Sequence, residues 1–564
     1  MDTNFELAEL LFPDIKKTTS DYENLYPPRE LPTTSMVTRF APSPTGFMHI
    51  GGISTALISK TLAKQTNGIF FLRIEDTDKK REIENGVYEI ITNLQNFNIT
   101  PDEGFIAPEK TVGCYGPYKQ SQRIPIYKTY IKELIKLGFA YPCFCSPEEL
   151  AISRQQQIEQ KIRPGYYGQW AHHRKFSLEE IKRELDQHRP FAIRLRAPEP
   201  NRKKIFFSDL IKGNIEFPVN DIDVVLLKSD NLPTYHFAHF VDDYLMRVTH
   251  VIRGDEWLSS LPIHLQLFQY FKKQPPYYAH VAPIAKIEGN SKRKLSKRKD
   301  PEAAVSYYYE KGYPSNGVIE YLLNLANSNF YSWRVENPTE PLEKFSFSFK
   351  NMGSSSAMFD ISKLDNICKN VISTMEIKSI YDQIVKWALA HDLPFAKIIQ
   401  KNKSYTLQIL DIENTEQKKR KDIACWSAIK ENLGFFYDEI FDEIPKELFP
   451  YPLNIGKADI RHVLSFFIDQ SEIQEPKDNW LIKVRLFFDT LGYAQNIKIL
   501  KLNPNKYKGA FGDLFMIIRV ALTSKTQTPD LYEMLKIMGA NRVKKRLTFA
   551  KKNDFVNIIK SSQY

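Results

Sequence analysis

The first part of the chain alternates between two hydrophobic patterns. Residues 36–40 and 69–75 are rich in β-branched and aromatic side chains and predict two short β-strands. Between them, apolar residues recur at helical spacing from about Gly51 until Asn67, which ends the pattern. A further apolar run at 223–228 predicts another strand. Strands that alternate with helices in this way favour a parallel, Rossmann-type sheet in an α/β domain.

The pattern becomes helical in the second half of the chain. Apolar residues recur at helical spacing at 318–327, 380–391 and 458–467, and each segment predicts a helix. Basic clusters at 418–421 and 542–546 lie among aromatic residues and fit either solvated helix faces or contacts with nucleic acid. Because 564 residues are too many for one core, we expect two to four domains.

Charge and cysteine content narrow the class of protein. The 78 Lys and Arg residues outnumber the 67 Asp and Glu residues, and the net charge of +11 fits a polyanionic partner. The chain starts without a signal-peptide pattern and has no apolar run of about 18 residues. Its five cysteines are too scattered for a disulfide framework. We therefore expect a cytoplasmic protein with no membrane contact.

The most informative loop joins the first predicted strand to the first predicted helix. Backbone N–H groups at the start of a helix have no partner within it, so they suit an anion such as a nucleotide phosphate. His49 lies just before this helix, within reach of such a phosphate, and Gly51 and Gly52 leave room for a purine or ribose. Taken alone, the loop is also explained as a structural turn.

A second segment is strongly cationic. Six of the eight residues at 292–299 are Lys or Arg, and Gly289 and Ser291 precede them. Such a run fits a solvated face, a non-specific nucleic-acid patch or a mobile clamp for an anion. In the last case, Lys294 and Lys297 would act as compact positive charges beside phosphate.

Together, the two segments resemble the signature motifs of class I aminoacyl-tRNA synthetases. The HIGH motif corresponds to 49–52 and the KMSKS motif to 294–298. Further segments narrow the resemblance to glutamyl-tRNA synthetase over residues 35–330, and 165–170 and 297–302 are most similar to the long clostridial variant. These further segments are 39–46, 73–78, 233–238, 241–243 and 251–257.

The resemblance implies a particular domain order. A Rossmann-type catalytic domain would carry an insertion that binds the acceptor end of tRNA, and α-helical stem-contact and anticodon-binding domains would follow it. The expected boundaries are 1–34 for an N-terminal extension, 35–114 for the first Rossmann half, 115–225 for the insertion, 226–330 for the second half with the KMSKS-like loop, 331–390 for the stem-contact domain and 391–564 for the anticodon-binding domain.

The implied activity is the ATP-dependent attachment of L-glutamate to tRNA-Glu. A glutamyl-adenylate would form first, and the two steps would release pyrophosphate and AMP. Mg²⁺ would accompany ATP, bound mainly to its phosphates. A monomer is expected. Whether tRNA-Gln is also charged with glutamate is left open, because the resemblance gives no residue-level guide to the anticodon contacts.

Three other functions share some of these sequence features. Glutaminyl-tRNA synthetase shares much of the catalytic core, but Arg253 favours a carboxylate over an amide, and the C-terminal part is helical rather than β-barrel. A truncated relative that glutamylates a modified tRNA base would lack an anticodon-binding domain, which does not fit 564 residues. A non-catalytic tRNA-binding paralogue would not need His49, Lys294 and Lys297.

The resemblance also implies an ATP site formed by both motifs. His49 and the Gly51 backbone would stabilise the ATP phosphates, while Lys294 and Lys297 would stabilise the leaving pyrophosphate. These four residues are the expected catalytic groups. The implied ATP-binding residues are Pro42, His49, Gly51, Gly52, Lys294, Ser296 and Lys297.

A glutamate site is implied beside it. Glutamate has two carboxylates and one ammonium, so its site needs cations and an acid. Arg39 and Arg253 can each grip a carboxylate with a planar fork, and Glu75 can pair with the ammonium. The implied glutamate-binding residues are Arg39, Ala41, Ser43, Glu75, Tyr235, His239 and Arg253, and His239 stands where some family members have asparagine.

The insertion departs from the family pattern at one place. Cys143 and Cys145 resemble the first ligands of a zinc site that some glutamyl-tRNA synthetases carry, where a tyrosine and a third cysteine complete the shell. Tyr166 is present, but Trp170 occupies the position of the third cysteine. We therefore expect no metal site. The alternative is zinc held by Cys143, Cys145, Tyr166 and His172.

Overall fold

The computed structural model describes residues 3–199, 203–415, 419–445, 449–452 and 455–552. They form two compact units, which are described here one at a time. The first unit consists of Met1–Tyr307 with Ile319–Asp360, and the second of Tyr308–Val318 with Ile361–Tyr564. No helix in the described ranges is long and apolar enough to cross a membrane.

The first unit contains the predicted strand–helix–strand pattern. Strands β1 (Val37–Phe40), β2 (Ile69–Leu72) and β3 (Glu103–Ala107) pair in parallel, and helix α3 (Ile50–Gln65) connects β1 to β2. Strand β4 (Lys110–Val112) adds an antiparallel edge. Three consecutive residues of β2 are fully buried, because helices and loops cover both faces of this sheet.

The second predicted strand is shorter than expected. The N–H of Arg73 still donates to the Phe40 carbonyl of β1 (3.0 Å), and the ladder stops there because the following N–H groups bond elsewhere. The N–H of Ile74 donates to the carbonyl of Tyr118 (2.8 Å), and the N–H of Glu75 donates to that of Pro42 (3.0 Å). The segment that carries Glu75 is thereby fixed against the loop that follows β1.

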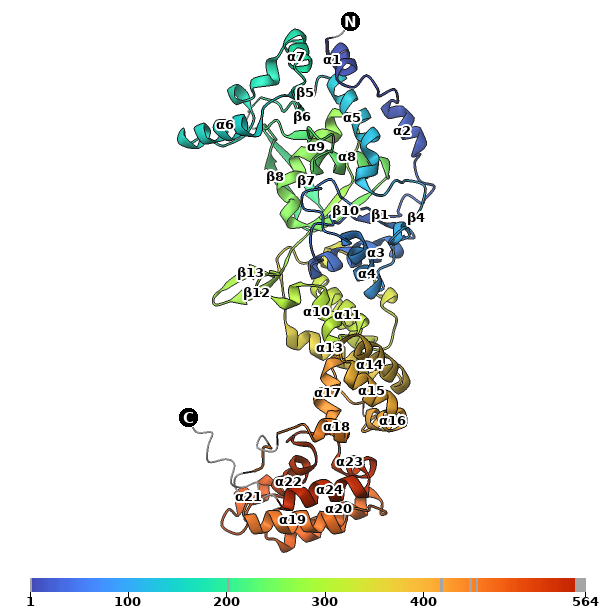
Figure 1. Ribbon diagram of the computed structural model, residues 1–564, viewed down its shortest axis with the longest axis vertical. Helices are drawn as coiled ribbons and strands as arrows, with labels where there is room; N and C mark the ends of the chain where they lie inside the picture. Colours follow the sequence, from blue (N-terminus) through green and yellow to red (C-terminus); the bar gives the residue numbers. More distant parts are fainter. Residues whose placement is uncertain (1–2, 200–202, 416–418, 446–448, 453–454, 553–564) are drawn as a thin grey trace. The chain divides into compact units, whose positions relative to one another are not determined.

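A second parallel pair lies beside β1. Strands β10 (His250–Gly254) and β11 (Tyr277–Val281) run in parallel, joined through a 3-10 turn and helix α9 (Leu261–Tyr270). The N–H of Thr249, just before β10, donates to the carbonyl of Val37 in β1 (3.0 Å). The carboxyl ends of β1 and β10 therefore meet at one edge, where parallel α/β sheets bind ligands (Figure 1).

A separate antiparallel sheet occupies the middle of the first unit. Its order is β5 (Ala140–Cys143), β6 (Ala192–Leu195) and β9 (Val225–Leu227). A separate hairpin of β7 (Lys204–Asp209) and β8 (Gly213–Pro218) contacts β11 through β7. The strand predicted at 223–228 is thus present as β9, and it pairs with β6 rather than with the parallel strands. The helices here are α5 (Ile124–Lys136), α6 (Pro147–Glu159), α7 (Leu178–Asp186) and α8 (Tyr235–Leu245).

The N-terminal segment packs on the first unit. Helix α1 (Thr3–Leu11) lies against α5, and α2 (Thr19–Leu25) follows it. Lys132 fixes the turn between them, because its ammonium donates to the carbonyls of Phe12 (3.0 Å) and Ile15 (2.8 Å). The other elements of this unit are α4 (Gly86–Asn96), β12 (Ile284–Glu288), β13 (Ser291–Lys294), α12 (Phe330–Glu336) and β14 (Ala357–Met358).

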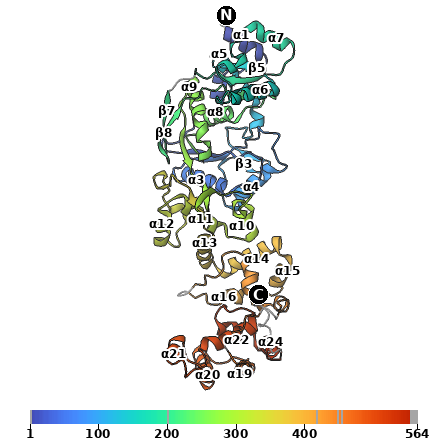
Figure 2. The same ribbon diagram turned by 90° about the vertical axis from the view of Figure 1, so that its left-hand side faces the viewer.

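The described residues of the second unit form helices joined by loops, with no strand of a sheet among them. Helices α19 (Lys457–Asp469), α22 (Phe511–Thr523) and α24 (Ala540–Lys552) pack together, as both views show (Figure 2). One cluster of buried apolar residues runs through the unit from Ile372 to Ala550. The other helices are α13 (Ile361–Ser373), α14 (Ile377–His391), α15 (Leu393–Lys401), α16 (Lys403–Asp411), α17 (Ser427–Leu433), α18 (Asp438–Phe441), α20 (Lys477–Thr490), α21 (Ile497–Leu502) and α23 (Leu531–Met538).

The three helices predicted in the second half of the chain are all present. They correspond to α11 (Ser315–Ala326), α14 and α19, and α10 (Ser306–Lys311) precedes α11. Of the basic cluster at 418–421, Lys418 lies outside the described residues. The finer domain boundaries at 114, 225, 330 and 390 stay predictions.

Candidate active site

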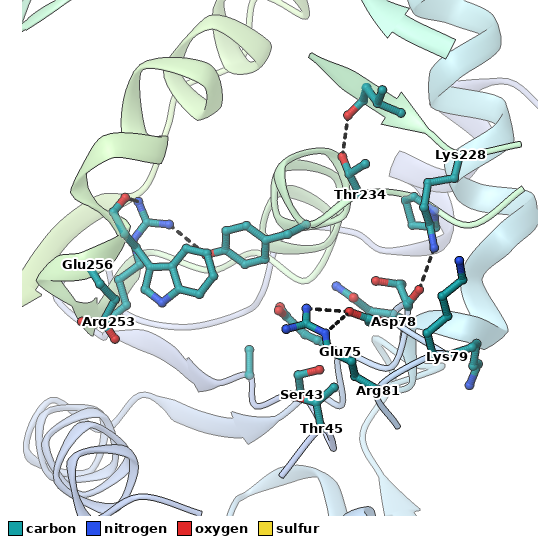
Figure 3. Close-up of a pocket in the computed structure, with 18 of the residues that line it drawn as sticks. Ser43, Thr45, Glu75, Asp78, Lys79, Arg81, Lys228, Thr234, Arg253 and Glu256 are labelled. Carbon is teal, nitrogen blue, oxygen red and sulfur yellow. Dashed lines mark hydrogen bonds and ion pairs between the residues drawn. The ribbon is translucent and has the colours of Figure 1, made fainter. Parts of the chain in front are cut away.

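A cavity of about 1290 Å³ opens at the edge where β1 and β10 end (Figure 3). The β1–α3 loop, the segment after β2, the start of α8 and the end of β10 line it, and part of the antiparallel sheet adds one wall. The structure brings most of the predicted site residues to this cavity. They are Arg39, Ala41, Ser43, His49, Gly51, Gly52, Glu75, Tyr235, Arg253 and Lys294.

Four predicted residues do not line the cavity. Pro42 is turned away, and its carbonyl accepts the N–H of Glu75. Ser296 and Lys297 belong to the loop after β13, beyond the Lys294 and Leu295 that form the rim. His239 is fully buried behind the wall.

His49 connects the two motif loops. As the N-cap of α3, its Nδ1 accepts the N–H of Gly51 (3.0 Å), so the ring proton must sit on Nε2. This Nε2–H donates to the carbonyl of Leu295 (3.1 Å). Burial lowers the pKa of His49. A neutral imidazole therefore holds the KMSKS-like loop next to the helix N-terminus.

The close approach of Gly51 to His49 leaves little space for a side chain. A Cβ on Gly51 would lie 3.2 Å from Nδ1 of His49, so the ring would have to shift by a few tenths of an ångström. Gly52 is less constrained, because a Cβ there would lie 3.6 Å from the Phe40 ring. The first glycine of the motif thus preserves the hydrogen bond between the ring and the helix start.

The KMSKS-like loop follows a β-hairpin and is held by a buried carboxylate. Asp300 accepts two hydrogen bonds from the Arg293 guanidinium (2.5 and 2.8 Å) and one from the N–H of Ser296 (2.8 Å). These bonds hold the pKa of Asp300 well below its usual range. Lys294 and Lys297, by contrast, are exposed, and Lys294 has Glu256 at 3.5 Å.

The guanidinium of Arg253 is buried and has no carboxylate partner among the described residues. It belongs to β10, and the residue is 5% exposed to solvent. One Nη donates to the hydroxyl of Tyr235 (3.0 Å), and the other to the carbonyl of Trp257 (3.3 Å). Among the residues that the structure describes, no carboxylate forms an ion pair with it. Because a buried charge needs a partner, this guanidinium at the cavity wall is suited to a carboxylate ligand.

Two other buried arginines near the cavity are paired. Arg73 contacts Asp243 (2.6 Å) and Glu75 (2.9 Å), and Arg39 contacts Asp243 (3.3 Å). Burial raises the pKa of Glu75, against the opposing effect of Arg73. Asp243 and Arg73 are structural partners that motif spacing does not identify, although both lie within segments that carry the family resemblance.

His239 touches the same network from behind. Its Nδ1 lies 3.2 Å from the carboxylate of Asp243, and its Nε2 lies 3.1 Å from the hydroxyl of Tyr278. Burial lowers its pKa well below the usual value. The geometry places it as a support of Arg39 and Asp243, out of reach of the cavity.

Basic side chains gather at another wall of the cavity, and motif analysis did not identify them. Figure 3 shows Lys79, Arg81 and Lys228 on this wall. Lys228 donates to the carbonyl of Thr77 (3.0 Å), and Lys79 pairs with Asp76 (2.8 Å). A cationic wall of this kind suits a phosphate backbone. The run of three basic residues at 79–81, directly after the 73–78 segment, was the available sequence signal.

A thiol–imidazole cluster also borders the cavity. The ligand atoms of Cys143, Cys145 and His173 lie within 4.8 Å of one another, and the Tyr166 hydroxyl is 3.5 Å from the Cys145 sulfur. A hydrogen bond from Cys145 lowers the pKa of the Cys143 thiol. His173, rather than the predicted His172, thus stands beside the thiols. Two thiols, an imidazole and a phenol are donors that suit zinc.

The fold and the cavity define a class I aminoacyl-tRNA synthetase of the E and Q type. The family described as "tRNA synthetases class I (E and Q), catalytic domain" matches residues 35–366, and an anticodon binding domain matches 504–551. A solved glutamate tRNA ligase from Elizabethkingia meningosepticum CCUG26117 shares 25% identity, covers 92% of this chain and 99% of its own, and aligns with a TM-score of 0.71.

Curated relatives narrow the family further. The chain is 44% identical over 541 residues to the glutamate–tRNA ligase of Clostridium perfringens strain 13, covering 96% of this chain and 99% of the relative. It is 42% identical to that of Acetivibrio thermocellus, covering 96% and 98%. The chain belongs to the glutamate–tRNA ligases, which confirms the predicted family, fold class and clostridial likeness.

Proposed function

We propose specific roles for the cavity residues in attaching L-glutamate to tRNA-Glu with ATP. Arg253 and Tyr235 bind the side-chain carboxylate of glutamate, and Glu75 binds the α-ammonium. The observation that carries this assignment is the buried, anion-free guanidinium of Arg253. Figure 3 shows Arg253 and Glu75 on different walls, so opposite charges face the cavity from separate sides, as an acidic amino acid requires.

Arg39, Ala41 and Ser43 complete the amino-acid side of the site. Arg39 is held by Asp243 at the end of β1, and Ala41 and Ser43 follow it along the cavity wall. Ser43 offers a hydroxyl donor, and Ala41 leaves space for the substrate. His239 supports this side from behind through Asp243.

ATP occupies the side of the cavity formed by the two motifs. Gly51 and Gly52 border the nucleotide, Pro42 holds the segment of Glu75 through its carbonyl, and His49 holds the loop of Ser296 in place through the Leu295 carbonyl. In the first step, the α-carboxylate of glutamate attacks the α-phosphorus of ATP, and the bond to the β-phosphate breaks. Lys294 and Lys297 stabilise the charge on the leaving pyrophosphate.

The second step uses the same cavity. A ribose hydroxyl at the 3′ end of tRNA attacks the carbonyl of the adenylate, and AMP leaves with the electrons of the broken carbon–oxygen bond. The basic wall of Lys79, Arg81 and Lys228 is suited to the approaching RNA strand. No protein nucleophile is needed in either step, so catalysis rests on position and charge.

Mg²⁺ is proposed as the companion of ATP. Within the described ranges, the cluster that could hold a metal consists of thiols and an imidazole, which suit zinc rather than a hard cation. The phosphates of ATP are therefore the main ligands for Mg²⁺. Bound Mg²⁺ supplies positive charge that neutralises the triphosphate.

We also propose a monomeric, cytoplasmic protein. Its cysteines are free, as a reducing compartment favours. Light scattering on the purified chain measures the first property, and a mass near 65.7 kDa is expected. A dimer mass would contradict it.

Charging assays test the proposed function. Purified chain, ATP, labelled glutamate and a tRNA-Glu transcript should give acid-stable labelled tRNA, and glutamine should not replace glutamate. Parallel reactions with a tRNA-Gln transcript decide whether the anticodon-binding region accepts it. Charging with glutamine, or no exchange of pyrophosphate into ATP in the presence of glutamate and tRNA, would contradict the proposal.

A further inference from the structure

Arg253 is itself held by a histidine on the neighbouring strand. Arg253 of β10 and His280 of β11 are partners in the parallel register. The Nε–H of Arg253 donates to Nε2 of His280 (3.0 Å), so this ring nitrogen must be unprotonated. The Nδ1 of His280 lies 2.6 Å from the Oδ2 of Asp209 and therefore donates its proton there. Both His280 and Asp209 are buried.

Asp209 reaches this position from outside the parallel strands. It ends β7 of the hairpin, and its Oδ1 accepts the N–H groups of Ile211 and Lys212 (2.9 Å each). These two bonds fix which oxygen of the carboxylate faces the turn and which faces His280. The hairpin thereby determines the tautomer of a histidine in a different part of the fold.

Burial is the largest influence on the pKa of His280 and favours the neutral ring that the two hydrogen bonds require. Burial lowers its pKa and so does Arg253, while the carboxylates of Asp209 and Asp255 oppose the change. The ring of Tyr278 stacks on His280 at 5.9 Å between centroids. In the neutral ring, Nε2 of His280 accepts the hydrogen bond from Nε–H of Arg253. A protonated ring would carry a proton on Nε2 and would face one N–H donor with another.

We propose that Asp209 and His280 are positioning residues for glutamate selection, because they hold the Nε edge of Arg253 and so fix the plane in which its guanidinium meets Tyr235, Trp257 and the substrate carboxylate. This inference rests on the proposed role of Arg253. It adds that specificity depends on a pair of side chains that do not touch glutamate.

Asp209→Asn is the sharpest test. The N–H groups of Ile211 and Lys212 face Oδ1, and the N–H of His280 lies 3.3 Å from Oδ1 and 3.2 Å from Oδ2. The amide oxygen is therefore favoured at Oδ1, where it can accept from all three, and the amide nitrogen then faces Nδ1 of His280 and donates to it. The ring must then carry its proton on Nε2, opposite the Nε–H of Arg253. We expect the KM for glutamate to rise by about tenfold or more, as the loss of a charge-assisted hydrogen bond would give. The KM for ATP should be unchanged.

A second pair of variants avoids dependence on one substitution. His280→Gln retains an acceptor for Arg253, whereas His280→Leu removes it, so Gln should retain most of the glutamate affinity that Leu loses. His250→Gln is the matched control, because His250 lies on the same strand as Arg253 and outside the cavity lining. Its kinetics should equal those of the unmodified chain. Equal losses in the two His280 variants would overturn the inference.

Two readouts separate the possible failures. Spectra of ¹⁵N-histidine-labelled protein, with His280 assigned from its loss in His280→Gln, should show an Nδ1–H tautomer that changes to Nε2–H in Asp209→Asn. If Arg253→Gln leaves the KM for glutamate unchanged, the proposed substrate site is wrong. If Arg253→Gln raises it while Asp209→Asn raises nothing and changes no tautomer, only the positioning role is overturned.

Discussion

The two sides of the proposed active site are built in opposite ways. On the glutamate side, Arg39, Arg73 and Arg253 are buried and held by hydrogen bonds of fixed direction. On the pyrophosphate side, Lys294 and Lys297 are exposed on a loop, and only the scaffold behind them is fixed, by Asp300. Preorganised forks select a substrate by shape and charge, whereas exposed ammonium groups meet a leaving group and release it into solvent.

Removing a charge from the exposed side should give the largest effect. Lys297→Ala deletes a cation proposed to stabilise the leaving pyrophosphate, so the rate of adenylate formation should fall by about 10²–10³-fold. Pyrophosphate exchange measures this rate, and filter binding measures tRNA affinity, which should change little. A comparable loss in both measurements would show that Lys297 serves RNA binding instead.

Removing the unpaired cation from the buried side should affect recognition. Arg253→Gln retains a hydrogen-bonding amide but loses the charge, so the KM for glutamate should rise by about 10–100-fold. The KM for ATP should stay the same, since the motif loops are untouched. An unchanged KM for glutamate would show that the buried side does not recognise the substrate through Arg253.

Substitution of Asp300 tests whether the KMSKS-like loop needs the buried carboxylate that holds it. Asp300→Ala leaves Arg293 and the Ser296 N–H without their shared acceptor, so the turnover of adenylate formation should fall about tenfold while the KM for glutamate is unchanged. Glu288→Gln is the matched control, because Glu288 also contacts Arg293 (2.7 Å) but is exposed, and it should change little. Equal losses would contradict a specific role of the buried carboxylate.

The hydrogen bonds of Asp300 to Arg293 and Ser296 also predict how the loop responds to pH. The pKa of Asp300 is lowered in the folded chain, so its contribution is fully present above the ordinary aspartate pKa and is lost only as pH falls through the lowered value. Loop order should therefore be constant across neutral pH. A loss of turnover in this range must come from another group.

The sequence predicts the elements that depend on local hydrophobic pattern and local chemistry. The strand at 36–40, the helix after Gly51 and the two motif loops follow from periodicity and from residues whose chemistry is local. It did not reach Asp209 or His280, which meet only because β7 packs against β11. It named His172 as the alternative zinc ligand, whereas the 3-10 turn at His172–Lys175 places the ring of His173 beside the thiols.

The position of His173 beside the two thiols gives the prediction with the smallest expected kinetic effect. Cys143, Cys145, His173 and Tyr166 form a donor set on the wall of the cavity, so chain purified without chelators should contain about one zinc per molecule by elemental analysis. His173→Ala should lose the metal and Cys145→Ser should do the same.

His172→Ala is the matched control, because its ring packs edge-on against Tyr166 at 6.5 Å and stands outside the ligand cluster. It should retain zinc. Since the cluster borders the cavity away from Lys297 and Arg253, metal loss should alter the stability of this wall and tRNA charging more than pyrophosphate exchange. Metal-free chain with ordinary stability would show that the cluster is only a hydrogen-bonded core. Zinc that is lost in His172→Ala and retained in His173→Ala would show that His172 is the ligand instead.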